Sequence, residues 1–312
     1  MPKTVSVIIP AYNEASNLPL MMDALGRLAS SNPSYAWEFV FVNDGSTDST
    51  LDILRSFRLK DSRVNVVSLS RNFGKENAML AGMDYAGGDA ILIMDADLQH
   101  PVDVVPRMLE LWEQGYEDVY GKRRDRGRES WLRKRLSLAY YSLLQGTTRI
   151  EVLRNVGDFR LLDRRVVNAI RSLRETQRYT KGLYCWVGYN KKEIEYDNLE
   201  RGSGESKFSI GKLINLAIEG ITCYTTAPLR IASVLGLIVS VTAFCYLVFV
   251  VAKTLIFGED VQGFPTLLCS ILLLGGLQLM CLGIIGEYIG RIFNETKRRP
   301  PYIVESFNEQ KL

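Results

Sequence analysis

The sequence predicts an α/β domain with a largely parallel sheet, followed by a hairpin of two transmembrane helices. Short apolar runs alternate with helical patterns from Val5 to Met94, which is typical of a parallel sheet flanked by helices. Two uncharged blocks, 231–252 and 264–286, then follow near the end of the 312-residue chain. Upstream of Arg230 the composition is that of a soluble protein.

Composition excludes several classes of protein. Hydrophobic residues make up 47% of the chain and charged residues 23%, which excludes a disordered protein. The net charge of +3 argues against a general nucleic-acid binder. The cysteines have no CxxC spacing and residues 1–10 lack a signal-peptide pattern, so we expect a reducing, cytoplasmic compartment. The single histidine, His100, cannot form a metal cluster by itself.

The predicted strands come first in the chain and alternate with helices. The strands are Val5–Pro10, Glu38–Val42, Val64–Leu69 and Ala90–Met94, and the helices lie around 18–25, at Thr50–Phe57 and at Asn77–Tyr85. Ligands of open α/β sheets bind beyond the carboxyl ends of the strands. Residues 5–14 contain no glycine and Gly74-Lys75 is followed by Glu76, so the dinucleotide fingerprint and the P-loop are both missing.

Asp95 and Asp97 follow the fourth predicted strand with one residue between them. Two carboxylates on the same side of a strand end repel each other, and a hard divalent cation such as Mg²⁺ removes that repulsion. The alternative is a solvated turn in which Asp97 caps a helix. Asp44 ends the second strand on the same sheet edge, where it could accept an N–H of a nucleotide base or serve as an Asp-Gly turn residue. Asp48 is as well explained by helix capping.

A basic stretch lies between Lys122 and Arg135, with eight cations against Asp125 and Glu129. Next to a membrane hairpin, lipid headgroups and a lipid phosphate are its expected partners. The planar guanidinium of arginine suits phosphate oxygens. A plain solvated face and a nucleic-acid site are the alternatives.

Each uncharged block spans roughly 33 Å as a helix, enough to cross a hydrocarbon core of about 30 Å. Arg230 precedes the first block, and Arg291, Lys297, Arg298 and Arg299 follow the second. Because basic residues are enriched on the cytoplasmic side of membrane helices, we expect both termini in the cytoplasm. Two buried helices of a soluble core are the alternative. Apolar residues recur at helical spacing over 210–221, which indicates an amphipathic helix on the inner leaflet or a helix packed on the soluble domain. The expected divisions are 1–206, 207–229, 230–290 and a cytoplasmic tail, 291–312.

Several motifs together resemble those of family 2 glycosyltransferases with the GT-A fold. They are SVIIPAYNE (6–14), NDGSTD (43–48), RNFGK (71–75), DADLQ (95–99) and NVGDFR (155–160). GESKF (204–208) and LGIIGEYIGR (282–291) narrow the resemblance to polyprenyl-phosphate glycosyltransferases, and most of all to bactoprenol glucosyltransferases. The resemblance implies a Rossmann-like GT-A domain with juxtamembrane amphipathic helices and a C-terminal two-helix hairpin in the inner membrane.

The resemblance also implies roles for individual residues. Those implied to contact the nucleotide sugar are Pro10, Tyr12, Glu14, Asp44, Asp95 and Asp97. Asp95, Asp97 and Gln99 are implied to bind Mg²⁺ or Mn²⁺, and Arg123, Arg133, Ser137 and Lys207 to bind the acceptor phosphate. The catalytic set is then Asp97, Asp158, Arg123 and Lys207. Asp158 remains open between a general base, a positioning group and a structural residue.

The expected reaction moves a hexose, with glucose from UDP-glucose favoured, onto undecaprenyl phosphate with inversion, for O-antigen or other cell-envelope glycan modification. A phosphate monoester has its second pKa near ~6, so this nucleophile hardly needs a general base. The alternatives are mannose from GDP-mannose, an aminoarabinose-type transfer, and an inactive membrane scaffold. A processive synthase is disfavoured because the chain lacks QxxRW and further membrane helices. The partners are a nucleotide sugar, a polyprenyl phosphate and the membrane, without nucleic acid, and a homo-oligomer is plausible.

Overall fold

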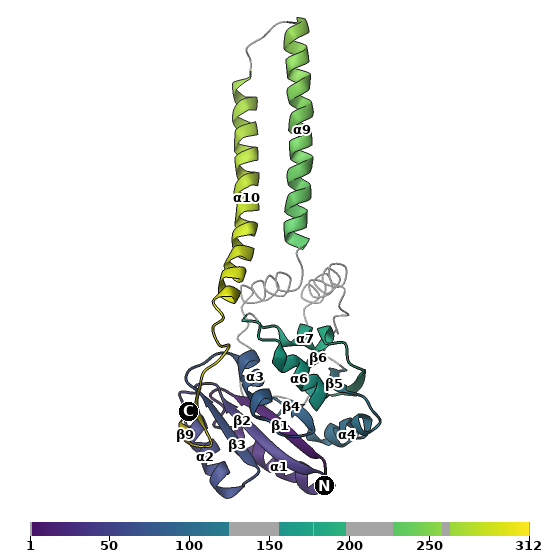
Figure 1. Cartoon of the computed structure of the whole chain (residues 1–312), viewed down its shortest axis with the longest axis vertical. Coiled ribbons are helices and arrows are strands. Elements are labelled where there is room, and N and C mark those ends of the chain that lie inside the picture. Colours follow the sequence, from purple (N-terminus) through teal and green to yellow (C-terminus); the bar gives the residue numbers. More distant parts are fainter. Residues whose placement is uncertain (1, 125–155, 177, 198–226, 258–262, 312) are drawn as a thin grey trace. The chain divides into compact units, whose positions relative to one another are not determined.

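A computed structural model describes residues 2–124, 156–176, 178–197, 227–257 and 263–311. The chain divides into two compact units, Met1–Ile210 with Arg299–Leu312, and Gly211–Arg298 (Figure 1). Most of the predicted amphipathic segment, 207–229, lies outside the described residues.

The first unit is built on a nine-stranded sheet of order β7-β5-β6-β4-β1-β2-β3-β8-β9. Its strands are β1 (Thr4–Ala11), β2 (Ala36–Asn43), β3 (Val64–Leu69), β4 (Ala90–Ile93), β5 (Asp118–Arg123), β6 (Val156–Asp163), β7 (Lys191–Tyr196), β8 (Val304–Phe307) and β9 (Gln310–Lys311). The four central strands, β4, β1, β2 and β3, are parallel and correspond to the four predicted strands. The sheet is mixed toward its edges, because β6 is antiparallel to both β4 and β5 and β8 is antiparallel to β3.

Helices cover both faces of this sheet. They are α1 (Leu18–Ser31), α2 (Thr50–Lys60), α3 (Lys75–Tyr85), η1 (Val102–Val104), α4 (Val105–Glu113), α6 (Arg164–Ser172) and α7 (Thr180–Trp186). One buried apolar cluster joins α1, α2 and α4 to one face, and a second joins α3, α6 and α7 to the other. Alternate residues of β1 enter the two clusters, Val7 the first and Ile8 the second, as the period of a strand requires.

Helix α3 packs closely against the sheet at Gly82. A Cβ at Gly82 would overlap the Ile8 side chain of β1, so the glycine is what allows the approach. The first residue of α3 is Lys75, which lies beside the carboxyl ends of the central strands. Figure 1 shows α3 next to these strands.

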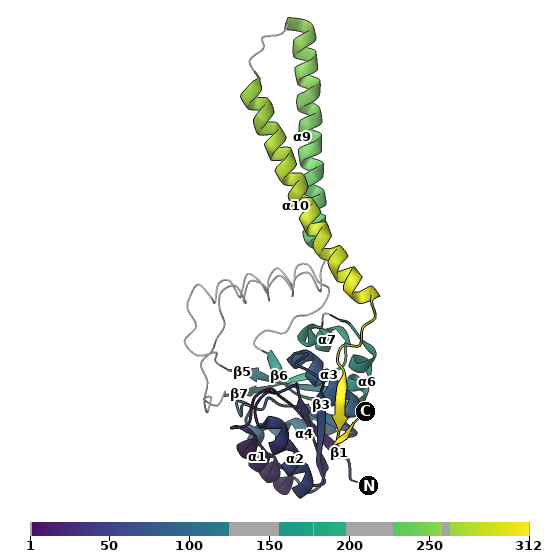
Figure 2. The ribbon, with the colours of Figure 1, turned by 90° about the vertical axis from the view of Figure 1, so that its left-hand side faces the viewer.

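The last residues of the chain belong to the first unit, which differs from the predicted tail at 291–312. β8 pairs with the outer edge of β3, as the yellow strand of Figure 2 shows, and Ser70 donates its N–H to the carbonyl of Ile303 (3.0 Å). Because β8 has only four residues, its alternation of apolar and polar residues is too short to predict a strand from the sequence. A segment separated from β3 by more than two hundred residues thus closes one edge of the sheet.

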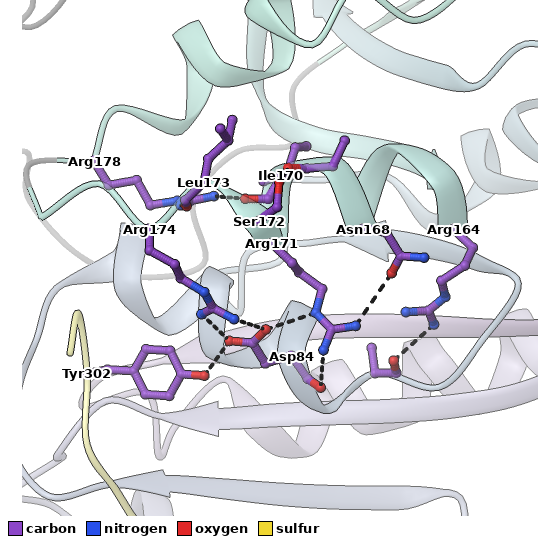
Figure 3. A network of polar contacts seen from close by, with 12 residues as sticks. Asp84, Arg164, Asn168, Ile170, Arg171, Ser172, Leu173, Arg174, Arg178 and Tyr302 are labelled. Carbon is purple, nitrogen blue, oxygen red and sulfur yellow. Dashed lines mark hydrogen bonds and ion pairs between the residues drawn. The ribbon is translucent and has the colours of Figure 1, made fainter.

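A polar network holds the same segment against α3 and α6 (Figure 3). Asp84, near the end of α3, accepts hydrogen bonds from Arg171 (2.8 Å), from Arg174 (2.7 Å) and from the hydroxyl of Tyr302. Burial alone would raise the pKa of Asp84, but hydrogen bonds from Arg174, Tyr302 and Arg171 outweigh it and the pKa is lowered. Asp84 therefore stays anionic and links three segments that are distant in sequence.

The second unit contains two long helices, α9 (Ala227–Phe257) and α10 (Phe264–Thr296). Both extend beyond the predicted blocks, 231–252 and 264–286, so that α10 takes in the first residues of the predicted tail. Within the described residues, Leu273–Thr296 is long and apolar enough to cross a membrane, and none of its apolar stretch is buried in the structure. Such a surface suits lipid, and the hairpin is a membrane-associating element.

Candidate active site

The site residues gather where the central strands end. Asp44 follows β2, and Asp95 and Asp97 follow β4, so all three lie at the carboxyl edge of the parallel strands. Asp158 joins them because β6 runs antiparallel to β4, which brings the start of β6 to that same edge. The structure thus places Asp95, Asp97 and Asp158 at one edge of the sheet, and their predicted roles stay predictions.

Lys75 bridges two of these carboxylates. Its Nζ lies 2.6 Å from Oδ1 of Asp95 and 2.8 Å from Oδ2 of Asp158. Burial by itself lowers the pKa of Lys75, but the charges of Asp158 and Asp95 outweigh it and the pKa is raised. Burial likewise raises the pKa of Asp158, but Lys75 and Lys181 outweigh it and the pKa is lowered. The ammonium and the Asp158 carboxylate are therefore both charged at neutral pH.

Asp158 is buried, with 7% of its surface exposed. Its Oδ2 is held by Lys75, whereas its Oδ1 is buried with no hydrogen-bond partner among the described residues. A buried acceptor without a partner costs free energy, and such atoms commonly mark a position for a water or a ligand. Among the described residues, Oδ1 thus remains open to a further hydrogen-bond donor.

The DADLQ segment forms a tight turn. Leu98 has a positive φ of 61°, and Oδ1 of Asp97 accepts the N–H of Gln99 (3.2 Å), which is itself buried. None of the described helices begins at Asp97, since η1 starts at Val102, so the structure does not support Asp97 as a helix cap. The turn leaves Asp97 half-buried beside the end of β4.

Negative charge accumulates at this edge without full compensation. Burial raises the pKa of Glu14, and the charges of Asp97, Asp95 and Asp48 raise it further, against a hydrogen bond from Asn17. These residues supply hard oxygen donors, which Mg²⁺ and Mn²⁺ prefer. In the described part of the chain, no group of three or more His, Cys, Asp or Glu side chains is arranged to hold a metal. The oxygen donors of Asp95, Asp97 and Gln99 are of the chemical kind that a divalent cation binds together with substrate oxygens, and their role as metal ligands stays a prediction.

The two loops after β1 and β2 are tied to each other. The N–H of Asn13 donates to Oγ of Ser46 (3.1 Å), and the N–H of Thr47 donates to Oδ1 of Asn13 (2.8 Å). Pro10 lies half-buried at the end of β1, and Tyr12 is 46% exposed. Tyr12 therefore presents a ring to solvent at the sheet edge, where a planar base could stack on it.

Asp44 is buried and bonded to the RNFGK segment. Its Oδ1 accepts the N–H of Phe73 (2.7 Å) and its Oδ2 accepts the N–H of Gly74 (3.0 Å). Gly45 has a φ of 64° and passes so close to Arg71 that a Cβ would clash with its backbone. The turn interpretation of Asp44 therefore describes its contacts in this structure. Each oxygen keeps a lone pair, so contact with a nucleotide base stays a prediction.

Of the four residues expected to bind the acceptor phosphate, Arg123 alone lies in the described part of the chain. It ends β5, and its Nε donates to the hydroxyl of Tyr196 (3.2 Å). Its neighbours Lys122 and Arg124 pair with Glu193 (3.0 Å) and Asp197 (3.3 Å), as expected for a solvated face. Arg133, Ser137 and Lys207 lie outside the described residues, so their predicted roles remain predictions.

Sequence reasoning gave no role to Lys75 or to His100. The buried His100 stacks on Phe159 (4.7 Å between centroids), and its Nδ1 accepts the N–H of Asp95 (3.1 Å). Burial lowers the pKa of His100, so the neutral ring with its proton on Nε2 fits these contacts. The position of RNFGK after β3, at the same sheet edge as DADLQ, was a signal for Lys75. No sequence pattern indicated the contact of His100 with Asp95.

Comparisons with known proteins identify the family. The family described as glycosyl transferase family 2 matches residues 6–171, and the GtrB C-terminal hairpin family matches residues 227–292. The bactoprenol glucosyl transferase of Shigella phage SfV is 42% identical over 97% of this chain and 98% of its own length. The prophage bactoprenol glucosyl transferase homolog of Escherichia coli K12 is 42% identical over 96% and 98%. The putative glycosyltransferase CsbB of Bacillus subtilis is 41% identical over 97% and 92%.

Among solved structures, glucosyl-3-phosphoglycerate synthase from Mycobacterium tuberculosis in complex with Mn²⁺ and UDP has a TM-score of 0.46 and 21% identity, covering 69% of this chain and 76% of its own. The resemblance seen in the motifs is confirmed by the family matches and by the relatives of nearly full length. The chain is a glycosyltransferase with a GT-A fold that belongs to glycosyl transferase family 2 and ends in a GtrB C-terminal hairpin.

Proposed function

We propose that the chain transfers glucose from UDP-glucose onto undecaprenyl phosphate at the cytoplasmic face of the inner membrane. The observation that carries the proposal is the acidic cluster of Glu14, Asp95 and Asp97 at the carboxyl edge of the sheet, beside the Lys75–Asp158 pair. This cluster suits a cation and a nucleoside diphosphate. The identities of the sugar and the lipid are supported by the bactoprenol glucosyl transferases, which match over nearly their whole length.

The donor would lie across the ends of β1, β2 and β4. Pro10, Tyr12, Glu14 and Asp44 would contact the nucleotide. Asp95, Asp97 and Gln99 would hold Mg²⁺ or Mn²⁺, which when bound stabilises the charge of the departing nucleoside diphosphate. The motif resemblance implies these assignments, and the position of the residues at the same sheet edge supports them.

The acceptor would be held by cationic and hydroxyl groups. Arg123, Arg133, Ser137 and Lys207 would grip the lipid phosphate, and the two helices α9 and α10 would span the bilayer, with both termini in the cytoplasm. The acceptor phosphate is mostly a dianion at neutral pH and attacks the anomeric carbon without losing a proton. Holding two anions at reacting distance is then the main task of the site.

Because the acceptor phosphate needs no general base, we propose that Asp158 positions the donor sugar and does not transfer a proton. An effective general base has a pKa near the working pH, whereas Lys75 and Lys181 lower the pKa of Asp158 against the effect of burial. A carboxylate with a lowered pKa is a weak base. It remains a strong hydrogen-bond acceptor, which suits contact with the hydroxyl groups of a sugar.

The test uses membranes containing the chain, defined undecaprenyl phosphate and radiolabelled nucleotide sugars. We expect label from UDP-glucose in the organic-extractable lipid, loss of that label with EDTA, and recovery when Mg²⁺ or Mn²⁺ is added. Label from GDP-mannose instead would reassign the donor. Absence of transfer from every nucleotide sugar tested, with the protein folded, would support an inactive scaffold. Membranes without the chain are the control.

A further inference from the structure

Lys75 is charged and lies at a place where a helix disfavours positive charge. It is the first residue of α3, whose N-terminus carries a partial positive charge from the helix dipole. A lysine is stable there because two carboxylates lie within 2.8 Å of its Nζ. The ion pair also stabilises Asp158, because burying a carboxylate without a cationic partner costs free energy. Neither the acceptor contacts nor the metal contacts proposed above use this lysine.

The bridge leaves one atom of Asp158 unused. Lys75 holds Oδ2, while Oδ1 is buried without a partner among the described residues. The residue after Lys75 joins the same end of α3 to α7. Oε2 of Glu76 accepts the N–H of Thr180, the first residue of α7, at 3.0 Å. Oδ1 of Asp158 is therefore the unsatisfied oxygen beside Lys75 on which the inference rests.

A sugar hydroxyl is a group that would satisfy Oδ1 of Asp158. Such hydroxyl groups donate and accept hydrogen bonds, and a carboxylate oxygen forms about twice as strong a bond as a neutral acceptor. The donor sugar is attached to the diphosphate that the Asp95 and Asp97 edge is proposed to hold. Lys75 contacts both Asp158 and Asp95. The residue proposed to bind the sugar and the residue proposed to bind the diphosphate would therefore be held in place by the same lysine.

We infer that Lys75 is a positioning residue, which holds Oδ2 of Asp158 against Asp95 so that Oδ1 accepts a hydrogen bond from a hydroxyl of the donor sugar. This inference rests on the proposed function, in which the donor is a nucleotide sugar. Lys75 acts through Asp158 and does not itself contact the sugar. Its effect is to fix the carboxylate, and with it the orientation of the anomeric carbon.

The test compares the binding of UDP-glucose and of UDP to the purified full chain in detergent, measured by calorimetry with Mn²⁺ present. The ratio of the two affinities isolates the sugar, because any effect of a substitution on the diphosphate cancels. We expect Lys75→Met to reduce this ratio roughly tenfold, which is the size expected for one hydrogen bond to a charged group. Lys75→Arg keeps the cation and should restore most of the ratio. Lys3→Met, which removes an ion pair to Glu113 far along the chain, is the control and should leave it unchanged.

Deoxy analogues of UDP-glucose separate action through Asp158 from direct contact. Four analogues each lack one of the free hydroxyl groups of the donor glucose. The analogue without the hydroxyl that donates to Oδ1 should bind the unchanged chain more weakly than UDP-glucose does. The Lys75→Met chain should bind this analogue and UDP-glucose equally well. If Lys75→Met leaves the UDP-glucose to UDP ratio unchanged, or still discriminates against that analogue, the inference is wrong while the proposed function stands. If the unchanged chain binds UDP but gains nothing from glucose, the inference is also wrong. Failure to bind any UDP compound would overturn the proposed donor and this inference with it.

Discussion

An Asp97→Asn chain is expected to transfer no measurable sugar to lipid. The substitution keeps the shape of the side chain and its bond to the N–H of Gln99, but removes the negative charge at the turn after β4. In the proposed site, the acidic cluster would lose a ligand for the divalent cation, and the departing diphosphate would lose the charge stabilisation that the cation would supply. We expect the initial rate of label incorporation into lipid to fall by about 10³-fold or more.

The matched control is Asp103→Asn, because Asp103 is exposed on η1 six residues further along the chain. It should transfer sugar at the unchanged rate. Asp158→Asn is the informative comparison, since an amide keeps one oxygen to accept a sugar hydroxyl and a positioning role tolerates it in part. Measurable transfer should therefore remain. Complete loss in both the Asp97→Asn and Asp158→Asn chains, with folding and donor binding intact, would count against positioning and favour a general base.

An Asp118→Asn chain is expected to unfold at a markedly lower temperature. Asp118 and Arg160 form a buried ion pair at 2.9 Å, with exposed side-chain fractions of 0% and 1%. Burial raises the pKa of Asp118 against the effect of Arg160. Removing one partner leaves the guanidinium buried without a counter-charge, which costs about 3 kcal/mol or more. For a domain of this size the midpoint should fall by about 10 °C, measured by circular dichroism in detergent.

Glu110→Gln provides the comparison for that prediction. Glu110 pairs with Arg107 at 2.6 Å, but both side chains are more than half exposed, and solvent-exposed pairs contribute little. Its midpoint should move by less than about 2 °C, which is the shift expected for a few tenths of a kcal/mol. Equal shifts in the Asp118→Asn and Glu110→Gln chains would show that the buried pair does not support the sheet. The stacking of Arg160 on Tyr184, at 3.6 Å, would then be the interaction that holds it.

The central sheet and the acidic edge were predictable from sequence because both depend on local patterns. Apolar runs such as Val64–Leu69 correspond directly to the observed strands, and strand ends in a parallel sheet meet at one edge. The placement of Asp95 and Asp97 there follows from that rule alone. The contacts of Asp44 with the N–H groups of Phe73 and Gly74 did not follow, since they depend on how two loops fold against each other.

The Lys75–Asp158 contact could not be predicted, because it depends on β6 running antiparallel to β4. No periodicity in residues 156–163 reveals strand direction, and most of the connection from β5 to β6 lies outside the described residues. The hydrogen bond of Tyr302 to Asp84 and the pairing of β8 with β3 were not predicted for a similar reason. A short strand after a long apolar helix has too few residues to show its partner.

The proposed site would hold two anions together, the donor diphosphate at the acidic edge through a cation, and the acceptor phosphate through arginine and lysine. A competition between two acceptors tests this arrangement, with the purified chain in detergent given equal amounts of undecaprenyl phosphate and undecaprenol and labelled UDP-glucose. We expect labelled product from the phosphate and none above background from the alcohol, whose hydroxyl needs a base and carries no charge to bind. Transfer to undecaprenol at a comparable rate would show that the charge of the acceptor is not what the site binds.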